Sequence, residues 1–108
     1  MSYTIRPGDT YVIDPSDKRV VTFDWSGLAS GVEISTSTFT IGTLKQNGLT
    51  ILTKDNPTIV AGNRGTQVRL DATTATVGDR YTLANAVVTN ESPAQTIERQ
   101  INILVQNQ

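Results

Sequence analysis

The stretch VVTFDW, residues 20–25, sets the pattern that decides the fold. Val21, Phe23 and Trp25 fall on one face of an extended chain, and the polar side chains between them fall on the other. Alternation with a period of two, in a segment rich in Val, Thr and aromatic residues, is typical of a β-strand with one buried face. We therefore expect a strand here that places Trp25, the single tryptophan of the chain, in the core.

The same alternation recurs along the chain between turn signals. It predicts strands at residues 65–72, 80–89 and 96–105, and the last of these has one wet end at Arg99. No stretch carries the spacing of an amphipathic helix. The run VEISTSTFTI, residues 32–41, changes its apolar face midway, which predicts a β-bulge or a change of sheet near Ser37.

Two turn signals refine this pattern between residues 43 and 60. Asn47-Gly48 lies between two β-rich runs and predicts a tight hairpin, because a type I′ turn needs positive φ at both central residues. Pro57 has no backbone donor for a ladder, so it indicates the start of a strand or an edge strand.

About seven short strands without helices predict an all-β fold, an immunoglobulin-like antiparallel β-sandwich. Tyr81 lies three residues after Gly78 and two before Leu83, a spacing similar to the tyrosine corner that opens strand F of such sandwiches. In antibody domains the tryptophan lies on the third strand, whereas Trp25 comes earlier, so the prediction concerns the architecture and not antibody-like topology. The expected core comprises Val21, Phe23, Trp25, Tyr81, Leu83, Ile101 and Ile103.

Residues 1–14 are expected to form an extended N-terminal arm before a sandwich at residues 15–108. Burial of a large apolar side chain is worth roughly 1.5–3 kcal/mol, so its apolar residues should be covered. Either the arm pairs with its own domain as an extra strand, or it adds a strand to a neighbouring molecule. The second alternative makes an interface of Tyr3, Ile5, Tyr11, Val12 and Ile13.

Composition narrows the possible chemistry. The 108 residues contain neither Cys nor His, which removes disulfides, the thiol nucleophile and the commonest general base. Net charge is -1 and the nine basic residues are scattered, so nucleic acid is not an expected partner. No apolar run has the length of a signal peptide core or a membrane span, and we expect synthesis in the cytoplasm and no membrane partner.

The remaining candidate sites have simpler structural explanations, and no catalytic, metal or cofactor site is expected. Asp14, Asp17 and Asp24 lack calcium-loop spacing and suit turns, and three further acidic residues are scattered, namely Asp71, Asp79 and Glu98. Three lysines are expected to be exposed, namely Lys18, Lys45 and Lys54, and Gly62 and Gly65 indicate a turn between strands. Trp25 with Tyr81 could form a sugar-stacking platform, but the parity of Trp25 favours the core.

Several motifs in one order resemble small phage proteins known as fiber-tail adaptors, which are immunoglobulin-like virion accessory proteins. The similarity spans roughly residues 13–105 and is carried by IDPSDKRVVTFDW (13–25), Gly31, Ile34, STSTF (35–39), GLTI (48–51), GDRYTLAN (78–85) and ERQINILV (98–105).

The resemblance implies a non-enzymatic structural component of a tailed-phage virion. Its expected partners are other virion proteins, on which it would dock at the tail, the fiber or the capsid as an adaptor or decoration protein, oligomeric in the particle. A carbohydrate-binding or adhesin-type β-sandwich module is the alternative from another class, and it would need exposed aromatic side chains.

Overall fold

The computed structural model describes residues 3–5, 8–25, 27–28, 30–47, 52–60 and 62–107, with only the backbone described for residues 3–5. These residues form eight strands: β1 (Tyr3–Ile5), β2 (Thr10–Ile13), β3 (Lys18–Asp24), β4 (Ile34–Lys45), β5 (Thr53–Ile59), β6 (Gly65–Asp71), β7 (Arg80–Thr89) and β8 (Thr96–Val105). None of the described residues belongs to a helix that could cross a membrane.

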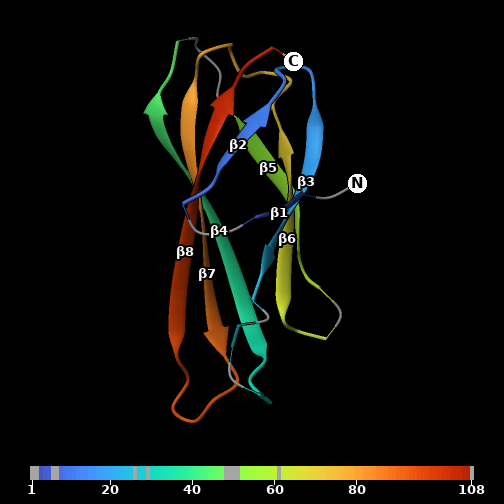
Figure 1. The fold of residues 1–108 in the computed structure, drawn as a ribbon, viewed down its shortest axis with the longest axis vertical. Coiled ribbons are helices and arrows are strands. Elements are labelled where there is room, and N and C mark those ends of the chain that lie inside the picture. Colours follow the sequence, from blue (N-terminus) through green and yellow to red (C-terminus); the bar gives the residue numbers. More distant parts are fainter. Residues whose placement is uncertain are drawn as a thin grey trace.

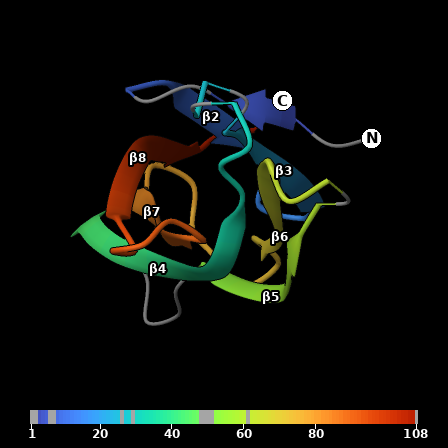
Figure 2. The same ribbon diagram turned by 90° about the horizontal axis from the view of Figure 1, so that it is seen from below.

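The strands form two four-stranded sheets that face each other (Figures 1 and 2). The first sheet has the order β1-β3-β6-β5 and the second has the order β2-β8-β7-β4. The core lies between them, and the rings of Phe23 in the first sheet and Phe39 in the second meet edge to face with centroids 5.8 Å apart. The all-β prediction with two packed sheets is therefore confirmed at this level.

The described parts of residues 1–14 do not project from the sandwich. β1 pairs with β3 and β2 pairs with β8, so each adds a strand to one sheet of the same chain, and Ile13 is buried. Both pairs are parallel, whereas the other four pairs are antiparallel, so the expectation of a purely antiparallel sandwich is wrong at these two strands. Bonds from Asn102 N–H to Asp9 O and from Gln106 N–H to Ile13 O tie the start of the chain to its end.

The predicted hairpin at Asn47-Gly48 differs from the structure. β4 pairs with β7 and β5 pairs with β6, so the strands on either side of Asn47 lie in different sheets and do not form one hairpin. Gly48 itself lies outside the described residues. The local turn signal could not reveal this, because only the packing of the whole chain selects the partner of each strand.

Register shifts in β4 and β5 correspond to two irregularities that the sequence predicts. The predicted bulge near Ser37 occurs slightly earlier, between Ile34 and Thr36, and it lets both Ile34 and Phe39 face the core. Pro57 lies in β5, an edge strand of the first sheet, at a register shift between Asp55 and Thr58.

Candidate functional site

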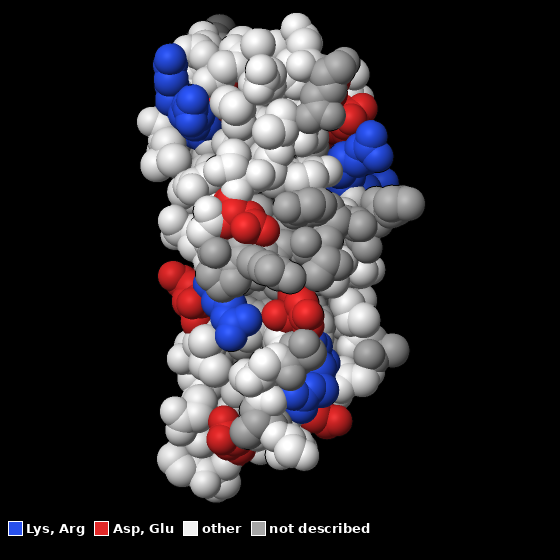
Figure 3. Space-filling view, viewed as in Figure 1, with Lys and Arg blue, Asp and Glu red and all other residues white. Residues whose placement is uncertain are grey.

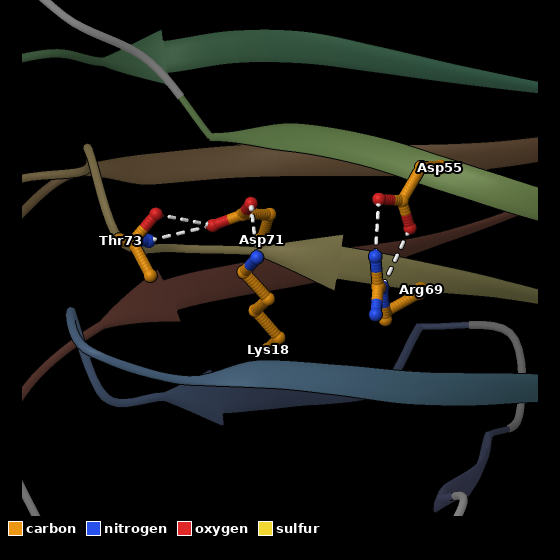
Figure 4. Close-up of polar contacts among 5 residues, drawn as sticks. All are labelled: Lys18, Asp55, Arg69, Asp71 and Thr73. Atoms are coloured by element: carbon orange, nitrogen blue, oxygen red, sulfur yellow. Dashed lines mark hydrogen bonds and ion pairs between the residues drawn. The ribbon is translucent and has the colours of Figure 1, made fainter.

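The outer face of the first sheet carries the densest group of charged side chains with described contacts (Figure 4). Arg69 on β6 is opposite Asp55 on β5, and its Nε and Nη2 atoms lie 2.7 and 2.6 Å from the two carboxylate oxygens. Lys18 on β3 is opposite Asp71 on β6, with Nζ 3.7 Å from Oδ2. The pairs follow from strand register, because residues directly opposite each other share one face of the sheet.

Asp55 and Asp71 are both held in the charged form. The hydrogen bonds from Arg69 lower the pKa of Asp55, and the pKa of Arg69 is raised by the same contact. The hydroxyl and N–H of Thr73 lower the pKa of Asp71 by donating to Oδ1, at 2.5 and 3.0 Å. A carboxylate whose charge is already balanced by a cation and by hydrogen-bond donors is a poor general base. These contacts are instead suited to holding β3, β6 and β5 in register.

A third carboxylate with a lowered pKa, that of Asp79, lies directly before β7. Asp79 is fully buried and accepts three hydrogen bonds, from Asn47 N–H at 2.7 Å, Thr76 N–H at 3.1 Å and the Tyr81 hydroxyl at 2.8 Å. Burial by itself raises the pKa of Asp79, but the three donors together lower it. Burial, followed by the bond to Asp79, raises the pKa of Tyr81. The Tyr81 hydroxyl thus binds a side chain two residues earlier, where a tyrosine corner uses backbone.

Trp25 lies at the centre of a buried polar network that joins the two sheets. Its Nε1 lies 3.0 Å from Asn85 Oδ1 on β7 and 3.2 Å from Thr66 Oγ1 on β6. Asn85 Nδ2 in turn donates to Ser37 Oγ on β4 at 2.8 Å. The guanidinium of Arg99 covers the indole, with its carbon 4.4 Å from the ring centroid.

The sugar-stacking interpretation of Trp25 and Tyr81 is wrong, because both side chains are fully buried. A sugar stacks on an open aromatic face, and one face of Trp25 is already occupied by Arg99. All seven expected core residues have 2% or less of their surface exposed, namely Val21, Phe23, Trp25, Tyr81, Leu83, Ile101 and Ile103.

The other carboxylates are not brought together. Asp14 Oδ1 accepts hydrogen bonds from the N–H and hydroxyl of Ser16, which is the turn chemistry expected before Pro15. Asp71 and Asp79 belong to the two separate groups above. Within the described part of the chain, no three acidic side chains converge as a metal would require.

The remaining predicted positions lie at the surface. Lys18, Lys45 and Lys54 are exposed, as expected. Gly62, with φ of 91°, lies in the turn between β5 and β6, which the bonds from Val60 N–H to Gly65 O and from Asn63 N–H to Val60 O close.

Only part of the predicted interface at the start of the chain is described at the side-chain level. Tyr11 and Val12 are half-buried and Ile13 is 1% exposed, so Ile13 belongs to the core of its own chain. The side chains of Tyr3 and Ile5 lie outside the described part.

The surface offers a shallow hollow and mixed charge. The hollow, of about 220 Å³, is lined by Ser37, Pro57, Thr58 and Ile59, between β4 and β5. Acidic and basic side chains are interspersed over the face seen in Figure 3.

Asn85 and Asp79 were the residues whose roles the sequence did not reveal. Asn85 lies at an inward position of the alternating strand, which was the available signal for a buried polar contact.

No protein-family model matches the chain, and no curated protein matches it.

Proposed function

We propose that this protein is a non-enzymatic structural component of a tailed-phage virion that docks on tail, fiber or capsid proteins. The observation that carries the proposal is that the carboxylates with lowered pKa values make structural contacts within the fold. Asp55, Asp71 and Asp79 each have a lowered pKa, and each is engaged in a contact that holds strands or loops of the fold together. Such a molecule works through the shape of its surface, since these three groups do not converge and none of them is among the residues that line the hollow described above.

The arrangement of strands supports an immunoglobulin-like assignment. Sheets of the order β1-β3-β6-β5 and β8-β7-β4 correspond to the A-B-E-D and G-F-C sheets of that fold, with β2 added beside β8. The parallel pairing of β1 with β3 is the feature in which this chain differs. The resemblance of the motifs between residues 13 and 105 to fiber-tail adaptors supplies the virion context.

A rigid sandwich suits such a role. β1 is paired in the first sheet, and β2 and β8 are paired with each other in the second, so the strands near both ends of the described chain are fixed and the outer surface has a defined shape. On a symmetric particle many identical copies bind at once, and weak contacts then add up to lasting attachment.

The test is the composition of purified particles. Phage produced from the genome that encodes this chain would be purified on a density gradient, and its proteins quantified by mass spectrometry. We expect this chain at a fixed ratio to the major capsid protein in independent preparations, also after a high-salt wash. An abundant host cytoplasmic protein serves as the control for contamination. Absence of the chain, or a ratio that varies with that contaminant, would refute the proposal.

Electron cryo-microscopy of the same particles would separate the two docking positions. Density of the sandwich at the tail or fiber would identify an adaptor, and density on the capsid would identify a decoration protein.

A further inference from the structure

β4 is one of the two edge strands of the second sheet and pairs on one side with β7. In the ranges that the structure describes, no strand pairs with its other side. At 12 residues it is the longest strand, about 40 Å at roughly 3.3 Å per residue. An edge of this length presents a row of backbone donors and acceptors to any other strand.

The two register shifts of β4 lie near its ends, between Ile34 and Thr36 and between Thr43 and Lys45, and residues 36–43 between them pair regularly with β7. This middle stretch lacks the features that usually prevent pairing with another chain. Residues 34–44 contain no charged residue and no proline. One edge strand of the first sheet, β5, is protected along its middle: it has Lys54, Asp55, Pro57 and a register shift between Asp55 and Thr58. Leu44 on β4 is also 63% exposed, which makes it the more exposed of the two large apolar side chains at the surface of the described part.

Charges of opposite sign flank the uncharged stretch. At one end Lys45 is paired in register with Arg80, so two like charges lie opposite each other, which is destabilising. Figure 3 shows basic side chains at the end of the molecule where β4 finishes, upper left in the view of Figure 1. At the other end Glu33 directly precedes β4. The ion pairs found among described residues involve none of these three side chains.

We propose that β4 pairs in antiparallel orientation with β4 of a second copy of this chain, about a two-fold axis near Thr40. Ile34 N–H already donates to Asn63 O, so the free edge begins at Ser35. With the axis at Thr40, Ser35 of one copy lies opposite Lys45 of the other. Glu33 is then one diagonal step from that Lys45, within reach of a long side chain.

The charge pattern selects this partner and this direction. Antiparallel pairing brings the basic end of each strand beside the acidic end of the other, twice per dimer, and it relieves the repulsion between Lys45 and Arg80. Leu44 of each copy comes opposite Thr36 of the other and loses exposed apolar surface. Parallel pairing would bring like ends together. This dimer forms in the purified protein, so it goes beyond the virion role and stands or fails independently of it.

The test measures self-association of the full chain by sedimentation equilibrium over a wide concentration range. We expect the wild type to reach twice the monomer mass. Glu33→Lys or Lys45→Glu alone turns both contacts into repulsions and should weaken the dimer about tenfold. The double variant Glu33→Lys with Lys45→Glu exchanges the two ends and should bind more tightly than either single variant. It does not regain the relief of the Lys45–Arg80 repulsion, which Lys45→Glu already removes in the monomer.

Two further variants complete the design. Thr40→Lys places like charges beside the axis and should also weaken the dimer, whereas Glu98→Lys on β8 makes the same charge change as Glu33→Lys away from the edge and should not. Circular dichroism melting confirms that each exposed substitution leaves the fold intact. A wild type that stays monomeric at all concentrations, or a double variant no tighter than the single ones, would overturn the proposal. A monomer would leave the edge to a strand of a different protein.

Discussion

The hydroxyl of Tyr81 donates a 2.8 Å hydrogen bond to Oδ2 of Asp79, and both side chains are fully buried. The same carboxylate accepts from the backbone of Asn47, after β4, and of Thr76, before β7. The buried carboxylate thus joins the start of β7 to the segment after β4 and to the loop before β7. The three donors offset the cost of burying the charge. Removing the Asp79 carboxylate should therefore lower the free energy of unfolding and change its dependence on pH.

Asp79→Asn should lower the free energy of unfolding at neutral pH by about 2 kcal/mol, because the amide group presents a donor to donors. The pKa of Asp79 in the folded protein is below its ordinary value of 3.8. Its stabilising contribution is therefore complete above that value and is lost as the pH falls through the lower, folded pKa.

Urea unfolding between neutral pH and the acid range measures this effect. The wild type should lose stability as the pH drops below 3.8, and Asp79→Asn should lose less. Glu98→Gln, an exposed acid on β8, is the control and should follow the wild type. Parallel pH curves for wild type and Asp79→Asn would show that Asp79 is not stabilised in its charged form.

Asn85→Leu should destabilise the protein by about 2–3 kcal/mol, because it leaves buried polar groups without partners. The Nε1 of Trp25 would lose its 3.0 Å acceptor and Ser37 Oγ its donor. The midpoint and slope of urea unfolding test this, and Asn102→Leu, an exposed position on β8, is the matched control. A loss no greater than that of the control would mean that water satisfies the network.

Arg99→Ala should expose the indole of Trp25, which is buried under the guanidinium. We expect a red shift of the tryptophan emission and stronger quenching by acrylamide, with a loss of about 1 kcal/mol. Because Trp25 is the single tryptophan, the signal has one source. Arg19→Ala on β3 should leave the emission unchanged, and an unchanged spectrum for Arg99→Ala would show that other atoms keep the ring dry.

Gly78→Ala should cost about 2 kcal/mol, since a side chain at positive φ is strained. Gly78 has φ of 93°, and a Cβ there would lie 2.8 Å from Asn47 Nδ2. Gly27→Ala is the control, because a Cβ at Gly27 meets nothing within 4 Å. Thermal melting of the two variants gives the comparison, and equal melting temperatures would contradict the predicted strain.

Much of the fold could be predicted from residues that are close in sequence. The alternation around Val21, Phe23 and Trp25 indicated which side of β3 is buried, and these three side chains lie in the core. The face change in residues 32–41 indicated a bulge, which occurs between Ile34 and Thr36. Strand partners were less accessible, because Asn47-Gly48 is a strong local turn signal, yet β4 and β5 belong to different sheets.

The sequence by itself determined the period-two alternation, and with it the β-strands and their buried faces, because each strand exposes one side of a pleat to the core. It also determined that neither cysteine nor histidine is available for chemistry. Only the tertiary structure decided that Trp25 contacts Asn85, 60 residues later in the chain. It also decided that β1 pairs in parallel with β3 and β2 with β8, and that Asp79 is buried among three hydrogen-bond donors. These contacts join segments far apart in the chain, and their energies depend on burial, which no local pattern specifies.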